Sequence, residues 1–431
     1  MTVRKLWRTL ALGVFGVVAL AACVPVSQSP APPPTAPPPP PNPCASVPAQ
    51  SGANGTDYVA VTNDGGKLGV HKFHAGSAAE RDQHLAELSK GGTVVSVAPD
   101  QTVRAAAITD PLALPDNPVQ WGIYDAQFPD AWTVTKGAGV RIAIVDSGVQ
   151  ADHEDLAGQV VAGKDFVTPG VTDGLTDFYG HGTHVAGIAA ALENGVGGVG
   201  GAPEAQLVSA RVLNCSGSGS LFNVEQGVLW AATPVAQGGG GAQVVNLSLG
   251  AFSDDPNLDA VIANIETRGI VVVAAAGNCG GGGPACQNVV NEPLYPAADS
   301  HVIAVASVDQ GDTRSSFSNA NPYVDIAAPG GSIVSTCPVS LPATKCTPTE
   351  PPVPGYSLKS GTSMSAPFVS AAAALLAAAC PGSPRNQGWV DFVENRLKAT
   401  ARNVQGQTLP NATYGAGILD AGAAVTNAPC P

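Results

Sequence analysis

Apolar residues along this chain form runs that predict buried strands and helices. Residues 139–146 form a nearly continuous apolar run, the pattern of a strand buried on both faces of a parallel sheet. Residues 271–278 are predicted to be a buried strand that ends in Gly-Asn, and residues 244–250 a further strand. Residues 371–379 are apolar on every side, which predicts a buried central helix. Another helix is predicted from residue 181 onward. Together these patterns predict one large domain of roughly 300 residues in the later part of the chain.

A smaller α+β unit is predicted ahead of it, over residues 56–110. Residues 58–61 and 93–97 are typical of strands, and residues 77–89 are typical of a helix that ends at two glycines. That helix is expected to bury one face, formed by Ala78, His84, Leu85 and Leu88.

The chain begins with an export signal. Basic residues at positions 4, 5 and 8 precede an apolar run, Leu10–Leu20, that is too short to span a membrane. The run ends in Leu-Ala-Ala before Cys23, which resembles a bacterial lipobox, where a diacylglycerol is attached to the cysteine and cleavage makes it the first residue. We therefore expect a signal peptide over residues 1–22 and lipidation of Cys23. The alternative is an ordinary signal peptide in which Cys23 is incidental.

A proline-rich spacer follows over residues 23–43. Its prolines can form neither a helix nor a strand ladder and favour an extended polyproline II rod. The spacer is expected to hold a domain away from the membrane. The alternative, a ligand for an SH3-like domain, is less suited to an exported bacterial protein.

Composition and charge narrow the class of protein. The sequence has 431 residues, of which 44% are hydrophobic and 12% are charged, and it contains 51 glycines. Its net charge of −13 becomes −16 when residues 1–22 are removed, because three basic residues are lost. Such an acidic surface argues against nucleic acid as a partner.

Three short motifs carry the candidate chemistry. They are Ile-Val-Asp-Ser-Gly around Asp146, Gly-His-Gly-Thr-His-Val around His181, and Ser-Gly-Thr-Ser-Met-Ser-Ala-Pro around Ser363. The order Asp, His, Ser is that of subtilisin and not that of chymotrypsin or the α/β-hydrolases. On these motifs the chain resembles the subtilisin-like serine proteases, nearest to the proteinase K branch. The resemblance implies an α/β fold with three layers, a mostly parallel central sheet and a buried central helix.

The resemblance assigns catalytic roles. Asp146 would orient His181 and stabilise its imidazolium form, His181 would act as general base and then general acid, and Ser363 would be the nucleophile. The apolar strand over residues 271–276 leads to Gly277 and Asn278, and the Asn278 amide would stabilise the oxyanion together with the Ser363 backbone N–H. We expect Pro367 to lie in the first turn of the central helix.

The substrate cleft follows from the same resemblance. One wall would be formed by Ser248, Leu249 and Gly250 and the other by Ala275, Ala276 and Gly277. Near the floor of the S1 pocket, Leu294 could shorten the pocket, or Glu292 could favour a basic P1 residue. The sequence does not decide between these two.

No cofactor is expected for catalysis, and structural calcium is an open question. Ser300, Val302 and Asp325 align with a calcium site of proteinase K-like enzymes, while the alternative role of Asp325 is that of a turn residue. A zinc site at His181 and His184 is disfavoured because their spacing and the lack of an intervening glutamate do not fit the zinc motif. His184 is expected to be a packed helix residue.

The chain has nine cysteines, and lipidation of Cys23 leaves eight, an even number that predicts disulfides in an exported protein. Two local pairs are expected, between positions 279 and 286 and between positions 337 and 346. The remaining cysteines are Cys44, Cys215, Cys380 and Cys430, whose connectivity the sequence leaves open. If every thiol is paired, Cys44 must bond to a cysteine of the catalytic domain.

The resemblance also divides the chain into domains. Residues 44–112 would be a propeptide that inhibits the enzyme, with processing around residues 104–115, and residues 113–431 would be the peptidase domain. The leading hypothesis is a membrane-anchored, exported serine endopeptidase that acts on polypeptides as a monomer, in part released from the cell. Two alternatives are a maturation protease of a secretion system, whose relatives carry a C-terminal membrane helix, and an inactive binding protein on the same fold.

Overall fold

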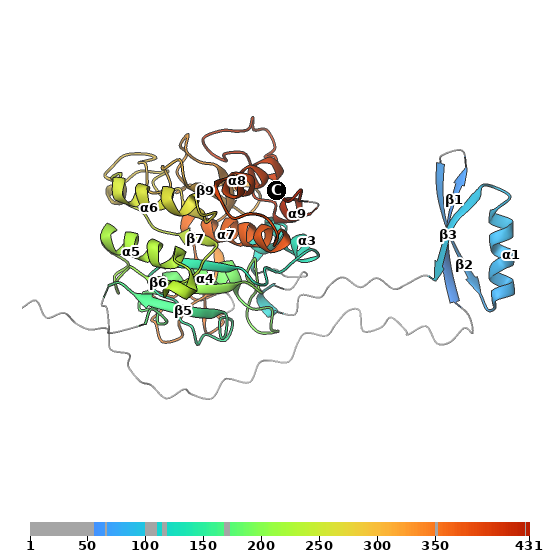
Figure 1. Ribbon diagram of the computed structural model, residues 1–431, viewed down its shortest axis with the longest axis horizontal. Coiled ribbons are helices and arrows are strands. Elements are labelled where there is room, and N and C mark those ends of the chain that lie inside the picture. Colours follow the sequence, from blue (N-terminus) through green and yellow to red (C-terminus); the bar gives the residue numbers. More distant parts are fainter. Residues whose placement is uncertain are drawn as a thin grey trace, which may run out of the picture. The chain divides into compact units, whose positions relative to one another are not determined.

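A computed structural model describes residues 56–64, 67–99, 110–113, 119–167, 173–349, 352–426 and 428–431 (Figure 1). The signal peptide, Cys23, the proline-rich spacer and Cys44 lie outside these residues. The chain divides into a small unit within residues 27–107 and a large unit that contains residues 108–431.

The small unit is a three-stranded antiparallel sheet with one helix. The strands lie in the order β2-β1-β3, and the elements are β1 (Thr56–Asp64), β2 (Lys67–Ala75), α1 (Ala78–Leu88) and β3 (Thr93–Pro99). Sequence analysis missed β2, whose apolar residues are interrupted by lysine and histidine. The expected buried face of α1 is wrong, since Leu85 and Leu88 are half-buried and Ala78 and His84 are exposed. One face of α1 packs on a sheet of only three strands, which is too small to bury the side chains of the helix completely.

The large unit is built on one mostly parallel sheet. Its strands lie in the order β10-β9-β8-β7-β4-β6-β5, with β11 paired to β9, and only β10 runs antiparallel. The bounds are β4 (Arg141–Asp146), β5 (Val160–Asp165), β6 (Gln206–Arg211), β7 (Val244–Leu247), β8 (Val271–Ala275), β9 (Ile303–Asp309), β10 (Thr313–Arg314) and β11 (Ile326–Pro329). A separate antiparallel hairpin pairs β12 (Ile333–Thr336) with β13 (Tyr356–Lys359).

Helices cover both faces of this sheet (Figure 1). On one face lie α4 (His181–Ala190), α7 (Thr362–Ala379), α8 (Gln387–Thr400) and α9 (Ala421–Val425), with the short helices α2 (Trp121–Asp125) and α3 (Phe128–Trp132). On the other lie α5 (Leu221–Ala232) and α6 (Pro256–Glu266). Single 3₁₀ turns are η1 (Pro111–Ala113), η2 (Val235–Gln237) and η3 (Pro284–Cys286). The expected three-layer α/β architecture is confirmed.

Strand β4 shows why its sequence is apolar throughout. Ile142 and Ile144 pack into the core under α4 and α7, while Ala143 and Val145 pack into the core under α5 and α6. Successive side chains alternate between two covered faces, so neither face tolerates a polar residue.

Helix α7 is the buried central helix that the sequence predicts. It is long and apolar enough to span a membrane by composition, with a mean hydropathy of 1.5, but 83% of it is buried inside the large unit. It packs against β7, β8, β9 and α4. Its apolar character therefore serves the core of this domain.

The large unit begins before the expected boundary at residue 113. Leu112 is buried and its N–H donates to Gly197 O at 2.8 Å. The buried carboxylate of Asp110 accepts from the N–H groups of Asn194 and Gly195. Residues 110–113 thus form part of the large unit.

Candidate active site

Asp146 ends β4 at the carboxyl edge of the sheet, where parallel sheets gather their functional residues. Its side chain is buried, and Oδ1 accepts from Ser147 N at 2.7 Å. Gly148 follows with a φ of +104°, and a β-carbon there would lie 2.3 Å from the carbonyl oxygen of Thr176. The turn after Asp146 therefore requires glycine.

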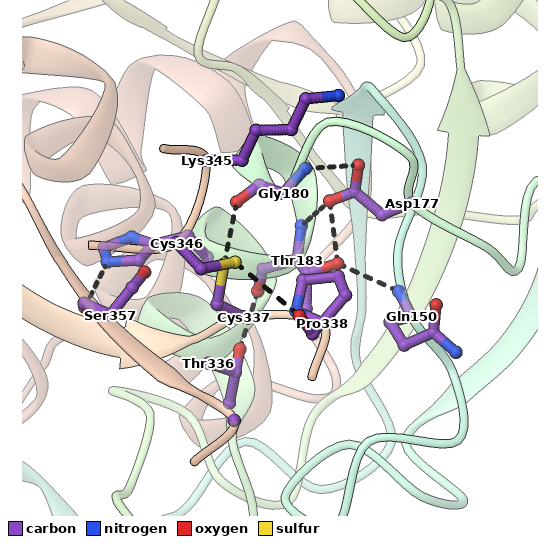
Figure 2. The surroundings of a disulfide bond; sticks show 12 residues. Gln150, Asp177, Gly180, Thr183, Thr336, Cys337, Pro338, Lys345, Cys346 and Ser357 are labelled. Carbon is purple, nitrogen blue, oxygen red and sulfur yellow. Dashed lines mark hydrogen bonds between the residues drawn. A yellow bond between two sulfur atoms is a disulfide. The ribbon is translucent and has the colours of Figure 1, made fainter. Parts of the chain in front are cut away.

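A second buried carboxylate, Asp177, organises the loop before α4. Its oxygens accept from the N–H groups of Tyr179, Gly180 and Thr183 and from the hydroxyls of Ser147 and Thr183, all at 2.8–2.9 Å. Figure 2 shows the contacts with Gly180 and Thr183. The carboxylate pairs N–H groups that the start of a helix leaves without partners, and its charge complements the positive end of the helix dipole. It thereby fixes the segment that carries the candidate histidine.

His181 and Asp146 form a close pair. The Nδ1 atom of His181 lies 2.9 Å from both carboxylate oxygens of Asp146. Burial lowers the pKa of His181, but the charge of Asp146 and the hydrogen bond to it outweigh burial, so that its pKa is raised above the usual 6.5. Because an ionised carboxylate only accepts hydrogen bonds, Nδ1 carries the proton and the neutral ring leaves Nε2 as a base.

Ser363 lies in the first turn of α7, which begins at Thr362. The helix continues through Pro367, so the expectation that Pro367 lies in the first turn is wrong. Proline has no N–H and cannot donate to the carbonyl four residues back, which is that of Ser363. This carbonyl accepts instead from the Ser248 hydroxyl at 2.7 Å.

Ser248 and Ser363 exchange hydrogen bonds between the sheet edge and the helix. The Ser363 hydroxyl donates to the Ser248 carbonyl at 3.1 Å, while the Ser248 hydroxyl donates in the opposite direction. Asn246 extends the connection, since its amide donates to the Ser248 hydroxyl and its carbonyl oxygen accepts from Ser370, both at 2.9 Å. The start of α7 is thus tied to the end of β7.

Asn278 is exposed just beyond β8, with a fixed amide orientation. Its Oδ1 accepts from both the backbone N–H and the hydroxyl of Thr362, each at 2.9 Å. Only the oxygen of an amide can accept these bonds, so the NH₂ group is the end left for another ligand. Asn278, His181 and Ser363 line one cavity of about 430 Å³. The structure thus brings together the four candidate catalytic residues.

The expected substrate walls also lie near Ser363. Ser248, Leu249 and Gly250 line a second cavity of about 450 Å³ that His181 shares. Ala275, Ala276 and Gly277 are buried at the end of β8.

Leu294 lies between the two expected walls. A β-carbon on Gly250 would lie 2.5 Å from Leu294 Cγ, and one on Gly277 would lie 3.2 Å from Leu294 Cβ. Glu292 contributes its backbone carbonyl, which accepts from the Asn319 amide at 2.8 Å. Leu294 therefore lies next to a residue of each wall, whereas only the backbone of Glu292 is seen to make a contact here.

His184 is fully buried in α4, as expected of a packed residue. Its Nε2 contacts the carbonyls of Ile333 and Ser357 at 3.2 and 3.0 Å, and burial lowers its pKa to about 3. No group of three or more His, Cys, Asp or Glu side chains suited to a metal occurs in the part of the chain that the structure describes.

The calcium alternative at Asp325 does not fit the donor set. One carboxylate oxygen accepts from the Lys398 ammonium at 2.9 Å and the other from Ala304 N at 2.9 Å. A lysine charge in direct contact opposes a divalent cation at the same carboxylate. The role of Asp325 is therefore structural, as the alternative stated.

Asp110 and Asp155 fit a hard cation better. Both side chains are fully buried, and Asp110 Oδ2 and Asp155 Oδ1 have no hydrogen-bond partner within the described ranges. Burial raises the pKa of both, that of Asp155 to about 6, and the charge of Asp110 adds to the effect on Asp155. Unpartnered buried carboxylate oxygens are costly, and calcium prefers such ligands.

Sequence reasoning missed three charged residues at this site. Asp177 lies four positions before His181 in a loop with no strong pattern, and Lys345 and Lys359 lie beyond the motifs, in the loop between β12 and β13 and at the end of β13. Asp177 and Lys359 each lie four residues before a motif residue, whereas Lys345 lies far from all three motifs in sequence.

Comparison with known proteins identifies the family. The sequence model of the protein family described as "Subtilase family" matches residues 137–417 of this chain. The chain is 44% identical to Thermitase of Thermoactinomyces vulgaris over 282 residues, which cover 65% of this chain and 90% of that protein. It is 37% identical to Subtilisin Savinase of Lederbergia lenta over 310 residues, which cover 71% of this chain and 98% of that protein.

A solved structure gives the same result for the fold. A protease structure from Pseudoalteromonas arctica PAMC 21717 matches with a TM-score of 0.61 and 30% identity. The match covers 75% of this chain and all of that chain. These similarities confirm the resemblance to the subtilisin-like serine proteases.

The His181–Asp146 pair predicts a distinct titration. The pKa of His181, measured by NMR of its ring nuclei, should lie above 6.5, because the carboxylate favours the protonated ring. The Asp146→Asn substitution should lower it, since the amide has no charge and burial then dominates. His184 serves as the internal control, because it should stay neutral between pH 5 and pH 8 in both proteins. A His181 pKa unchanged by the substitution would contradict this account.

Proposed function

The chain belongs to the subtilase family and is a serine endopeptidase, and we propose that Asp146, His181 and Ser363 form its catalytic triad. The observation that carries this proposal is the pairing of His181 Nδ1 with the buried Asp146 carboxylate, in a cavity that Ser363 shares. The inactive binding protein is disfavoured, because the sequence contains each residue that the chemistry needs.

In the acylation step, Ser363 Oγ attacks the carbonyl carbon of the scissile bond. The hydroxyl first turns from the Ser248 carbonyl toward His181 Nε2, which takes its proton as the new carbon–oxygen bond forms. Asp146 stabilises the resulting imidazolium. The ring then gives the proton to the leaving amine, and a water molecule deacylates Ser363 by the same route.

Negative charge on the tetrahedral oxygen is stabilised by two donors. One is the free NH₂ group of Asn278, which Thr362 holds in orientation, and the other is the backbone N–H of Ser363 in the first turn of α7. The positive end of the helix dipole adds to both. No metal or cofactor is needed for these steps.

The substrate is proposed to bind in extended form along Ser248–Gly250, with Ala275–Gly277 as the opposite wall. Leu294 contacts the positions of both walls, which favours small side chains at P1. We therefore favour the shortened pocket, one of the two alternatives that the sequence left open.

A fluorophosphonate probe tests the proposed nucleophile. The processed protein should be labelled, and Ser363→Ala should abolish labelling and peptide hydrolysis, because the attacking oxygen is removed. The matched control is Ser316→Ala, a substitution at an exposed serine that should keep both. Absence of labelling in correctly processed protein would overturn the proposal.

Asn278→Ala should lower kcat by about 10²–10³ with little change in KM, because the amide donates chiefly to the transition state. Steady-state kinetics on a peptide substrate measure both constants. Asn257→Ala, at an exposed position in α6, is the control. An effect confined to KM would contradict the oxyanion role.

We further propose that Asp110 and Asp155 hold a structural calcium ion. Calcium would relieve the repulsion between two buried carboxylates and give their unpartnered oxygens a ligand. Its contribution would be to the stability of the fold, since the site is separate from the triad.

Chelation should therefore lower the melting temperature of the inhibited enzyme, and added calcium should restore it, because a ligand bound only to the native state stabilises it. Asp155→Asn should reduce this calcium response. Asp152→Asn, which alters a neighbouring exposed aspartate, should leave it unchanged. Equal responses in both variants would exclude this site.

The N-terminal regions complete the proposal. The small α+β unit within residues 27–107 would act as inhibitory propeptide, while residues 110–113 would stay with the enzyme because they pack into the large unit. Lipidated Cys23 would anchor the exported protein to the cell membrane.

A disulfide is proposed to keep the processed enzyme on this anchor. The structure pairs Cys279 with Cys286, Cys337 with Cys346 and Cys380 with Cys430. Cys215 is also disulfide-bonded. With Cys23 carrying lipid, Cys44 is the partner that we propose.

Mild reduction should then release the processed catalytic domain from membranes, because cleavage near residues 104–115 leaves this disulfide as the only covalent link to the lipid. Membrane fractionation and immunoblotting measure the release. Cys215→Ser should release the domain without reduction, and Cys23→Ser should abolish anchoring altogether. Retention of the reduced domain would contradict the tether.

A further inference from the structure

We propose that the leaving-group side of the active site is a basic subsite, formed by Lys345 and Lys359, that selects an acidic side chain at P1′ or P2′. This inference rests on the proposed function, because it assigns the two flanks of the triad to the two sides of the scissile bond. It adds a substrate class that the catalytic residues themselves do not specify.

The two cavities around His181 lie on different flanks. One includes Ser248–Gly250, the proposed binding edge for the acyl side of the substrate. The other includes Asn278, Ser363 and both lysines and excludes that edge. Residues after the scissile bond must leave the triad away from the acyl side, so the second cavity is the one that they enter.

Positive charge dominates the lining of this second cavity. Besides the catalytic residues, its lining comprises Tyr179, Thr344, Lys345, Thr347, Leu358, Lys359, Ser360 and Met364. The set includes two lysines and no aspartate or glutamate. Asp146 and Asp177 lie nearby, but both are buried and their oxygens already accept hydrogen bonds from His181 and from the loop before α4.

A disulfide holds the loop that carries Lys345. The Cys337–Cys346 bond closes this loop, and it packs directly on the residue before His181. A β-carbon on Gly180 would lie 3.1 Å from Cys337 Sγ and 3.4 Å from Cys346 Sγ. Figure 2 shows Lys345 beside Gly180, close to the disulfide and to Asp177.

The Lys345 ammonium is itself fixed in place. It donates to the carbonyls of Phe178 and Cys215 at 2.7 and 3.0 Å, and it lies 5.7 Å from the centre of the Tyr179 ring. Lys359 donates to the carbonyl of Lys345. Lys359 is thus tied to the backbone of the loop that carries Lys345, and both side chains lose little further freedom when a ligand arrives.

Donor capacity remains for a ligand. An ammonium group has three N–H donors, and in the described contacts Lys345 uses two of them and Lys359 uses one. Burial lowers the pKa of Lys359, which the charges of Asp177 and Asp146 oppose. A partly buried ammonium gains from a carboxylate partner, since charge-assisted hydrogen bonds are the stronger kind.

The alternative is that both lysines only brace the loop. In that case their removal would destabilise the site or lower all rates equally, without changing the preference for an acidic side chain. The ratio of kcat/KM for matched acidic and neutral substrates separates these roles, because a uniform loss cancels from the ratio.

The test uses the processed enzyme and quenched fluorescent peptides that share P4–P1 and differ only at P1′ and P2′. Glu, Gln and Lys are compared at each position, with active enzyme counted by fluorophosphonate titration. Wild-type enzyme should favour Glu over Gln by about tenfold or more at one of the two positions. The preference should weaken as ionic strength rises.

The double variant Lys345→Met/Lys359→Met should reduce the Glu to Gln ratio to about one, because it removes both charges. Lys359→Glu should instead favour the lysine peptide. Lys164→Met, at an exposed lysine on β5, should keep the wild-type ratio. If the double variant does not fold, Lys359→Gln alone should still lower the ratio.

Two outcomes would overturn the inference while leaving the proposed function intact. They are efficient cleavage with no preference for Glu over Gln, and a preference that survives loss of both lysines. Failure of labelling and of cleavage for every peptide would instead remove the proposed function on which the inference rests.

Discussion

The exchange of hydrogen bonds between Ser248 and Ser363 joins the two parts of the molecule on which the site depends. The end of β7 provides the proposed binding edge for the substrate, and the first turn of α7 provides the proposed nucleophile and an N–H donor. The substrate can meet the nucleophile only if these two segments are held in a fixed position relative to each other. Pro367 makes the connection possible, because its lack of an N–H leaves the Ser363 carbonyl free for Ser248. The apolar length of α7, buried against the sheet, then prevents the nucleophile from shifting along the helix axis.

Buried charge sets the chemistry around this connection. Asp146 raises the pKa of His181 against the effect of burial, and Asp177 pairs the N–H groups that bring the histidine to its position. Lys345 and Lys359 then place positive charge on the flank of the same histidine. The pKa of His181 is therefore raised above 6.5 although the ring is largely removed from solvent, and the charge of Lys359 acts against this rise.

Disulfides brace the segments that surround the site. The Cys279–Cys286 bridge follows Asn278 directly, and the Cys337–Cys346 bridge packs against Gly180. Both close short loops, which carry side chains next to catalytic groups without a strand or helix to hold them. A covalent link supplies order that a small polar loop cannot obtain from a core. The Cys380–Cys430 bridge instead joins the end of α7 to the end of the chain.

The sequence by itself determined the parts of this protein that depend on local pattern. Apolar runs identified β4, β7, β8 and α7, and the motifs around Asp146, His181 and Ser363 identified the family. The tertiary structure decided what depends on contacts between distant segments. It brings Asp177, Lys345 and Lys359 close to His181 and places Leu294 between the cleft walls. It also makes Asp110 and Asp155 better candidates for a calcium site than Asp325, whose carboxylate is paired with Lys398. A local pattern records which residues a strand or helix needs, whereas the partner of a buried charge lies wherever the fold brings the chain back, so no short stretch of sequence contains it.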